Sequence, residues 1–274
     1  MGTGMTTPAY LLGAVQMTST DDRAKNLDTA VRLVGEAADL GARLIGLPEN
    51  FAFMGPEEAR REGAETLEGP TLSVLREVAR RRRLHVLAGS ISERTDDPRR
   101  TANTSALLGD DGSVLAVYRK IHLFDVAIPD GARYAESEGV CAGDQVVVAA
   151  TALGRIGLSI CYDLRFPELY RQLATLGAEI LAIPSAFTLY TGKDHWEVLV
   201  RARAVENLAY VLAPAQVGKH GPRRETFGNA MIVDPWGVVL ARCADGEGVC
   251  VAPFRRERLE RVRRELPALK HRRL

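Results

Sequence analysis

Three side chains that could do chemistry lie far apart in the sequence, and each comes directly after a predicted strand. Cys161 stands between an alternating apolar run and a Pro-Glu pair that opens a helix. Glu49 follows a short apolar run, and Lys120 follows the second strand of a hairpin predicted over 103–118. Because strand ends in α/β folds meet where sites form, we expect the three side chains to lie close together.

This trio fits the hydrolysis of a carbon–nitrogen bond. A cysteine thiol has an ordinary pKa of about 8.5, so a base that takes its proton during attack accelerates that step by roughly 10²–10⁴. Glu49 can be that base, and it can pass the proton to the leaving nitrogen and then activate water. Lys120 and the backbone N–H of Tyr162 can stabilise the negative oxygen of the intermediate, and Glu136 can hold the lysine and the water.

Each of these residues also has a structural interpretation. A buried free cysteine is more often a packing residue than a nucleophile. Glu49 could cap a helix, and Lys120 could be a surface residue that follows a strand. The combination is more specific than any one member, so we favour the catalytic interpretation.

The composition indicates one domain without nucleic-acid or membrane partners. The chain has 274 residues and is 46% hydrophobic, so residues 1–274 are interpreted as a single domain with one large core. A formal net charge of +1 gives no field that would recruit nucleic acid or an acidic membrane, and no long apolar segment predicts a membrane span. From about residue 254 onward, the basic sequence predicts a docked helix and a short tail.

The cysteines and histidines predict neither a metal nor another cofactor. The four cysteines form no C-x-x-C pair and no cluster with zinc spacing, which favours reduced thiols in the cytoplasm. The five histidines lack metal-site spacing, and no phosphate-binding loop or dinucleotide fingerprint occurs. The expected partner is therefore a small molecule.

The predicted elements alternate as in α/β proteins. Strands are predicted at 8–17, 44–47, 85–90, 103–108, 114–118, 154–160, 180–184, 210–216, 229–233 and 238–241. Helices are predicted at 22–41, 57–65, 71–83, after 161 to about 176, and 195–208, and residues 121–145 are interpreted as a long loop. The pattern Gly-Ala-x5-Pro-x2-Phe begins at Gly41 and again at Gly177, so we expect two halves of like topology that form two face-to-face sheets with helices outside.

Characteristic blocks surround the reactive residues. They are Leu-Pro-Glu-Asn-Phe around Glu49, Tyr-Arg-Lys-Ile-His-Leu-Phe-Asp around Lys120 and Cys-Tyr-Asp-Leu-Arg-Phe-Pro-Glu-Leu from Cys161. These blocks resemble the signatures of the nitrilase superfamily of carbon–nitrogen hydrolases, and Pro-Ser-Ala-Phe, His-Trp-Glu and Asp-Pro-Trp-Gly resemble its Nit branch. The resemblance implies an α/β fold of four layers, α-β-β-α, that pairs into homodimers. It places the family's Glu, Lys and Cys at those three positions and its second glutamate at Glu136, with Glu138 as the alternative.

The same resemblance suggests how a substrate would be held. Arg165, four residues after the nucleophile, could bind a substrate carboxylate, although it could also pair with Glu168. The other residues expected to line the pocket are Tyr162, Phe187, Thr191 and His195.

One stretch bears on the substrate. Gln-Val-Gly-Lys-His at 216–220, followed by Arg223-Arg224, resembles deaminated glutathione amidases more than omega-amidases. We therefore predict an amidase that acts on a small 2-oxo amide such as deaminated glutathione through a cysteine thioester. The alternatives are an omega-amidase acting on 2-oxoglutaramate, an N-carbamoyl-amide hydrolase and, from a different class, a non-catalytic binding protein of the same fold.

Overall fold

The first half of the chain builds a sheet with a parallel centre. The computed structural model describes residues 9–127, 133–222 and 224–273, and Arg223 of the stretch noted above lies outside them. The strands of this half are β1 (Tyr10–Met17), β2 (Ala42–Gly46), β3 (His85–Leu87), β5 (Thr101–Leu108) and β6 (Val114–Arg119). β1, β2 and β3 pair in parallel in that order, and β5 and β6 continue the sheet antiparallel.

The second half builds a sheet of six strands with the same order. Its strands are β10 (Val148–Thr151), β11 (Gly154–Leu158), β12 (Ile180–Ala182), β13 (Tyr210–Ala213), β16 (Met231–Val233) and β17 (Val239–Arg242). β11, β12 and β13 pair in parallel, and β16 and β17 continue antiparallel, as β5 and β6 do in the first half. The prediction of two halves of like topology is confirmed.

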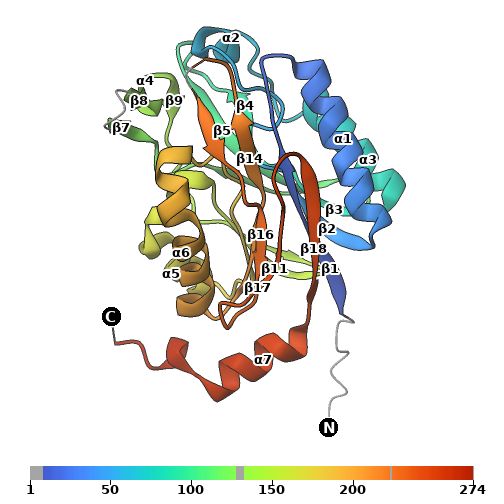
Figure 1. Cartoon of the computed structure of the whole chain (residues 1–274), viewed down its shortest axis with the longest axis vertical. Helices are drawn as coiled ribbons and strands as arrows, with labels where there is room; N and C mark the ends of the chain where they lie inside the picture. Colours follow the sequence, from blue (N-terminus) through green and yellow to red (C-terminus); the bar gives the residue numbers. More distant parts are fainter. Residues whose placement is uncertain (1–8, 128–132, 223, 274) are drawn as a thin grey trace.

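Helices cover the outer faces of both sheets. α1 (Arg23–Asp39) and α3 (Pro70–Arg82) pack on the first sheet, and α5 (Pro167–Thr175) and α6 (Leu189–Asn207) pack on the second. Figure 1 shows these two pairs on opposite sides of the strands. One hydrophobic cluster joins the inner faces of the sheets, including Leu12 and Leu44 from the first and Leu181 and Leu212 from the second. The fold is the predicted α-β-β-α sandwich.

Strands of the second half also complete the first sheet. β14 (Ala215–Lys219) pairs in parallel with β1, β15 (Glu225–Phe227) pairs with β14, and β18 (Gly248–Phe254) runs antiparallel along β1. The single strand predicted over 210–216 is therefore wrong, because Pro214 separates β13 in one sheet from β14 in the other. A proline has no N–H for a sheet ladder, so it fits such a change of sheet. The crossing places Gln216 against the backbone of Glu49.

Several short elements differ from the prediction. α6 begins at Leu189 and not near His195, so this helix starts earlier than predicted. The predicted long loop over 121–145 contains β7 (Asp125–Ala127), β8 (Arg133–Ala135), α4 (Glu136–Gly139) and β9 (Val140–Cys141). These elements, like the unpredicted β4 (Ile91–Arg94) and β10, are too short to give a hydrophobic period.

The remaining helices are short. They are α2 (Glu57–Glu62), α7 (Arg256–Glu265) and the 3₁₀ helices η1 (Cys161–Arg165) and η2 (Ala268–Lys270). α7 is the predicted C-terminal helix, and it docks through the buried side chains of Leu259 and Val262. In the described part of the chain, every helix is too short or too polar to cross a membrane.

Candidate active site

The nucleophile candidate sits on a strained corner. Cys161 joins β11 to η1 with a φ of 48°, a left-handed conformation that costs a residue with a Cβ on the order of 1 kcal/mol or more. Its backbone N–H donates to the carbonyl of Pro184 at 2.9 Å. The N–H of Tyr162, which comes next, lies in the first turn of the 3₁₀ helix, where N–H groups have no acceptor within the helix. The corner thus places the thiol next to a backbone N–H that can donate a hydrogen bond to a bound molecule.

Asp163 ties this corner to the segment that carries the lysine. Its Oδ2 accepts from the backbone N–H of Ile160 at 2.8 Å and from the hydroxyl of Tyr118 at 2.7 Å. Its Oδ1 accepts from the backbone N–H of His122 at 3.0 Å and lies 2.7 Å from Nδ1 of that ring. The carboxylate is fully buried, so these contacts supply its whole environment. Asp163 therefore links the turns around Cys161 and Lys120.

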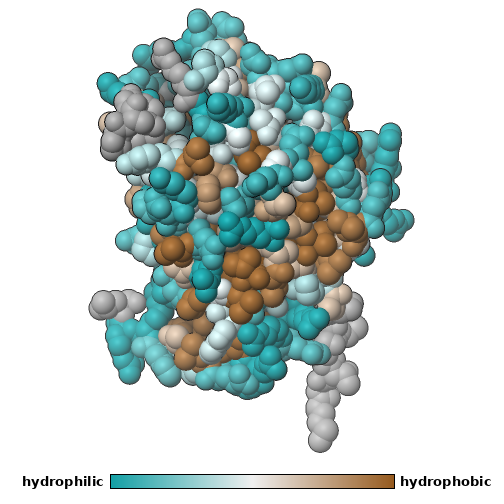
Figure 2. Space-filling model, viewed as in Figure 1, coloured by the Kyte–Doolittle hydropathy of each residue, from teal (hydrophilic) through white to brown (hydrophobic). Residues whose placement is uncertain are grey.

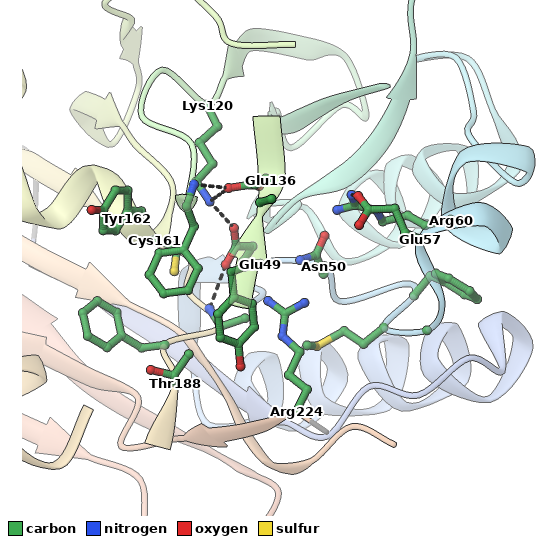
Figure 3. Close-up of a pocket in the computed structure, with 18 of the residues that line it drawn as sticks. Glu49, Asn50, Glu57, Arg60, Lys120, Glu136, Cys161, Tyr162, Thr188 and Arg224 are labelled. Atoms are coloured by element: carbon green, nitrogen blue, oxygen red, sulfur yellow. Dashed lines mark hydrogen bonds and ion pairs between the residues drawn. The ribbon is translucent and has the colours of Figure 1, made fainter. Parts of the chain in front are cut away.

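The three predicted catalytic side chains converge. Nζ of Lys120 lies 3.0 Å from Oε1 of Glu49 and 2.8 Å from Oε2 of Glu136 (Figure 3). Oε2 of Glu49 accepts from the backbone N–H of Ala186 at 3.0 Å, and the negative charge of Glu49 acts on the nearby Cys161 thiol and raises its pKa. Glu49, Lys120 and Cys161 come from the ends of three strands, as their positions in the sequence suggested.

Glu136 and Glu138 occupy different environments. Besides its contact with Lys120, Oε2 of Glu136 accepts from the backbone N–H of Phe124 at 2.7 Å. Glu138 is exposed and lies 3.6 Å from Arg133. Only the first of the two glutamates touches the lysine, so Glu136 is the one that can steady it.

A buried asparagine that the sequence reasoning missed bridges the two glutamates. Nδ2 of Asn103 donates to Oε1 of Glu49 at 2.9 Å and to Oε1 of Glu136 at 3.0 Å. Asn103 lies on β5, where every residue from Thr101 to Leu108 is buried. The run of polar residues in a buried strand was the signal available in the sequence, because buried polar side chains need partners.

The charges in this cluster are mutually dependent. Burial by itself lowers the pKa of Lys120, but the negative charges of Glu136 and Glu49 outweigh burial and hold its pKa above the ordinary value. Burial raises the pKa of Glu136, yet the charge of Lys120 and its hydrogen bonds bring that pKa down to about 2. Burial and the charge of Glu49 raise the pKa of Cys161 well above its ordinary value, despite the opposing effect of Lys120. The resting state is therefore a neutral thiol beside a protonated amine.

These groups open into a pocket of about 910 Å³, counting the part that is open to solvent. Figure 3 shows Lys120, Glu49 and Cys161 at one side of it, with arginine side chains approaching from other directions. The lining combines the catalytic candidates with aromatic and charged side chains, among them Phe53, Phe124, Tyr134, Tyr162, Phe187, Arg60, Arg133 and Arg224. The buried thiol thus reaches solvent through a cavity large enough for a small molecule.

The predicted substrate residues divide into two groups. Tyr162, Phe187 and Thr191 line the pocket, but neither Arg165 nor His195 is among its lining residues. The guanidinium of Arg165 lies over the rings of Phe187 and Tyr162 and reaches Nδ1 of His195 at 3.3 Å. The ion pairs of the described residues include none between Arg165 and Glu168, so that structural alternative is wrong, whereas the binding of a substrate carboxylate by Arg165 stays a prediction. Arg165 thus stacks on two lining residues without being part of the lining itself.

Arginines from other elements take its place in the lining. Arg60 comes from α2, Arg133 from β8 and Arg224 from the residues just before β15. No spacing in the sequence relates them to Cys161; the resemblance pointed to the stretch that contains Arg224, but only the fold shows that its side chain lines the pocket. Among residues 9–127, 133–222 and 224–273, no three His, Cys, Asp or Glu side chains are arranged to hold a metal ion.

Known sequences match the chain along nearly its whole length. A family model described as carbon-nitrogen hydrolase matches residues 11–264. A protein of Synechocystis named deaminated glutathione amidase is 47% identical over 266 residues, which make up 96% of this chain and 98% of that relative.

Solved structures share the fold. The NitFhit protein of C. elegans matches with a TM-score of 0.92 and 39% identity over 98% of this chain and 66% of that chain. Nit3 of Saccharomyces cerevisiae, described as a member of branch 10 of the nitrilase superfamily, matches with a TM-score of 0.88 and 29% identity over 100% of both chains. The arrangement of layers and strands described above is therefore shared over the full length of a solved protein.

Proposed function

Because the chain belongs to the carbon–nitrogen hydrolase family, we propose that it is an amidase that hydrolyses deaminated glutathione through a thioester on Cys161. The family acts on non-peptide carbon–nitrogen bonds. The observation that carries the proposal for this chain is that the Cys161 thiol, the Glu49 carboxylate and the Lys120 ammonium, which lies 3.0 Å from Glu49, line one open pocket. The name of the Synechocystis relative supports the choice of substrate.

The first step is attack by sulfur on the amide carbon. The raised pKa of Cys161 keeps the sulfur protonated until a substrate arrives, so the proton must leave during the attack. Glu49 lines the same pocket as the thiol and its charge acts on the thiol pKa, so we assign Glu49 as the base. A positioned base of this kind contributes roughly 10²–10⁴ to the rate.

The attack places a negative charge on the amide oxygen. Nζ of Lys120 is held by Glu49 and Glu136, and the N–H of Tyr162 follows the nucleophile in the chain. Both donors are fixed before substrate binds, and fixed donors at a developing oxyanion are usually the largest catalytic contribution. We assign Lys120 and the Tyr162 N–H to this role.

Collapse of the intermediate breaks the carbon–nitrogen bond. Glu49, now protonated, gives its proton to the leaving nitrogen, and the acyl group stays on Cys161 as a thioester. Water then takes the place of the amine and attacks the thioester carbon while Glu49 accepts its proton. The carbon–sulfur bond breaks, the acid leaves, and Glu49 returns the proton to the sulfur of Cys161. Glu136 fixes Lys120 through both steps by the 2.8 Å contact.

The test compares variants and substrates. Cys161→Ala removes the nucleophile but keeps a small apolar side chain, so it should abolish turnover while the fold remains intact by circular dichroism. Wild-type protein should release Cys-Gly from deaminated glutathione faster, by kcat/KM, than it releases ammonia from 2-oxoglutaramate. Normal turnover by Cys161→Ala would refute the thioester, and a preference for 2-oxoglutaramate would favour the omega-amidase alternative.

We also propose that the chain forms a homodimer through α6 and the turn between β16 and β17. Val198 and Val205 on α6 and Trp236 and Val238 near the turn are large exposed apolar residues. A Cβ on Gly237 would lie 2.5 Å from Val205, so the helix and the turn form one continuous surface. Figure 2 shows apolar side chains gathered where Figure 1 places β16 and β17. Light scattering should give twice the chain mass, and Val198→Glu with Val205→Glu should halve it.

The cytoplasm is the proposed location. The four cysteines are all free in the structure, and three of them are buried without a disulfide. Reduced thiols of this kind fit a reducing compartment. Fractionation of cells that express the native gene should place the protein with cytoplasmic markers, and recovery in an oxidising compartment would contradict this.

A further inference from the structure

The pocket holds more positive charge than the catalytic cluster needs. Lys120 contacts two carboxylates, Glu49 and Glu136, so that cluster carries one excess negative charge while the thiol is neutral. Three arginines, Arg60, Arg133 and Arg224, add positive charge elsewhere in the same lining. These arginines lie away from the lysine, which suggests that their positive charge has a second function.

Two of the three arginines already have acidic partners. Arg60 forms an ion pair with Glu57, which also lines the pocket. Arg133 lies 3.6 Å from Glu138, with both side chains largely exposed. Neither guanidinium is therefore fully available to a ligand.

Arg224 differs from both. Its Nε is buried and has no hydrogen-bond partner in the part of the chain that the structure describes, and none of the ion pairs there involves its guanidinium. A buried N–H without an acceptor is unfavourable, and more so in a charged group. The geometry leaves a cation in the pocket wall that a bound anion would complete.

The position of Arg224 relates it to the reacting atoms. Figure 3 shows its side chain extending into the pocket from the side opposite Lys120, with Glu49 between them. An anion on Arg224 would therefore lie on the far side of Glu49 from the lysine, where the guanidinium can balance its charge. A substrate with a carboxylate a few bonds from its amide could reach both places at once.

The fold supports Arg224 from behind. The next residues form β15, which pairs with β14, and the backbone carbonyl of Arg224 accepts from the N–H of His220 at 2.8 Å. The ring of His220 is held in turn by Ser19 and Thr226, each at 2.7 Å. Arg224 thus projects from a hydrogen-bonded hairpin, which favours one orientation of its guanidinium.

We propose that Arg224 is the residue that binds the carboxylate of the substrate and so selects acidic amides over neutral ones. This inference rests on the proposed amidase function, and it transfers to Arg224 the role that the sequence suggested for Arg165. A guanidinium is suited to the role because its two parallel N–H groups match a carboxylate.

The experiment measures protection of the thiol, so it does not depend on turnover. Iodoacetamide alkylates Cys161 slowly, and the rate is followed by peptide mass spectrometry. 2-Oxoglutarate is the acid that forms from the acyl part of deaminated glutathione when its amide bond is hydrolysed, and it should protect the thiol. Arg224→Gln should raise the half-protecting concentration about 10- to 100-fold, as expected for loss of a charged hydrogen bond. Arg224→Lys, which keeps the charge but loses the fork, should fall between.

Arg61→Gln is the matched control. Arg61 is exposed on α2, does not line this pocket, and loses the same charge on substitution. It should change the half-protecting concentration less than twofold. An equal shift in Arg61→Gln and Arg224→Gln would overturn the proposal, because it would show a general effect of net charge. Dimethyl 2-oxoglutarate, which lacks free carboxylates, should protect both variants and the wild type alike.

Turnover identifies which carboxylate is bound. 2-Oxoglutaramate has a carboxylate only in its acyl part. Deaminated glutathione has a carboxylate in its acyl part and a second one in its leaving group, Cys-Gly. A similar loss of kcat/KM in Arg224→Gln on both substrates supports binding of the acyl-side carboxylate, and a loss confined to deaminated glutathione supports binding of the other. If wild type hydrolyses neither but Arg224 still governs protection, the amidase function fails and the carboxylate site stands. If wild type hydrolyses both substrates but protection is unchanged in Arg224→Gln, the carboxylate site fails and the amidase function stands.

Discussion

Replacing Asp163 by asparagine should weaken both the fold and the reaction. The carboxylate accepts from donors through both oxygens: Ile160 N–H and Tyr118 at Oδ2, and the backbone and ring of His122 at Oδ1. An asparagine keeps one oxygen and presents an NH₂ group in place of the other. Whichever way the amide turns, one backbone N–H then faces a donor.

The size of the effect follows from that count. The backbone N–H of Ile160 or of His122 loses its acceptor in a buried site, which costs about 1–3 kcal/mol. The hydroxyl of Tyr118 or the ring of His122 can rotate or change tautomer, so it adds less. The remaining contacts lose the strengthening that a charged acceptor gives. We therefore expect the free energy of unfolding to fall by about 2–4 kcal/mol.

Urea denaturation and steady-state kinetics measure the two effects. Asp234→Asn is the matched control, because Asp234 is also buried and uses both oxygens, Oδ1 for the N–H groups of Trp236 and Val238, each at 2.9 Å, and Oδ2 for Arg258 at 3.1 Å, and it does not line the pocket. Both variants should lose stability, but only Asp163→Asn should lower kcat, since only that residue holds the corner at Cys161. Equal kcat values for the two folded variants would refute the positioning role, and unchanged stability in Asp163→Asn would refute the hydrogen-bond argument.

Two further predictions follow from pKa shifts. Glu49→Gln removes a negative charge that raises the pKa of Cys161, so the thiol pKa should fall relative to wild type. Turnover should drop roughly 10²–10⁴-fold, because the base is lost. Thiolate absorbance against pH measures the thiol pKa, and an unchanged value would contradict the prediction. Burial lowers the pKa of His220 to about 4, so the unfolded chain binds the proton first as pH falls from 6.5. Stability should then decline by about 3 kcal/mol between pH 6.5 and pH 4, and His220→Gln should lose that part of the decline; parallel denaturation profiles for the two proteins would contradict this.

The catalytic candidates were predictable because their signals are local. Cys161 and Glu49 each follow an apolar run that forms a buried strand, and such strands end where chemistry is usually found. The repeated Gly-Ala-x5-Pro-x2-Phe pattern likewise marks the turn into and out of β2 and β12, so it disclosed the two halves. These features depend on neighbours within a few residues, which a sequence displays directly.

The arginines of the substrate wall were not predictable for the opposite reason, although Tyr162, Phe187 and Thr191 were expected there and line the pocket. Arg224 reaches the pocket only because the chain changes sheet at Pro214 and returns as the hairpin of β14 and β15. Arg165 is near Cys161 in sequence, but stacking on Tyr162 and Phe187 and the contact with His195 turn it from the pocket. Such outcomes follow from packing between distant segments, and no spacing in the sequence encodes them.

The central claim is that Glu49, Lys120 and Cys161 make one covalent catalyst, and trapping the acyl-enzyme tests it most directly. Wild-type protein mixed with deaminated glutathione and quenched in acid within one turnover should gain the mass of the acyl group on the peptide that contains Cys161. Cys161→Ala should show no such gain. Turnover of the wild type without any adduct on that peptide, or an adduct on another cysteine, would contradict the account.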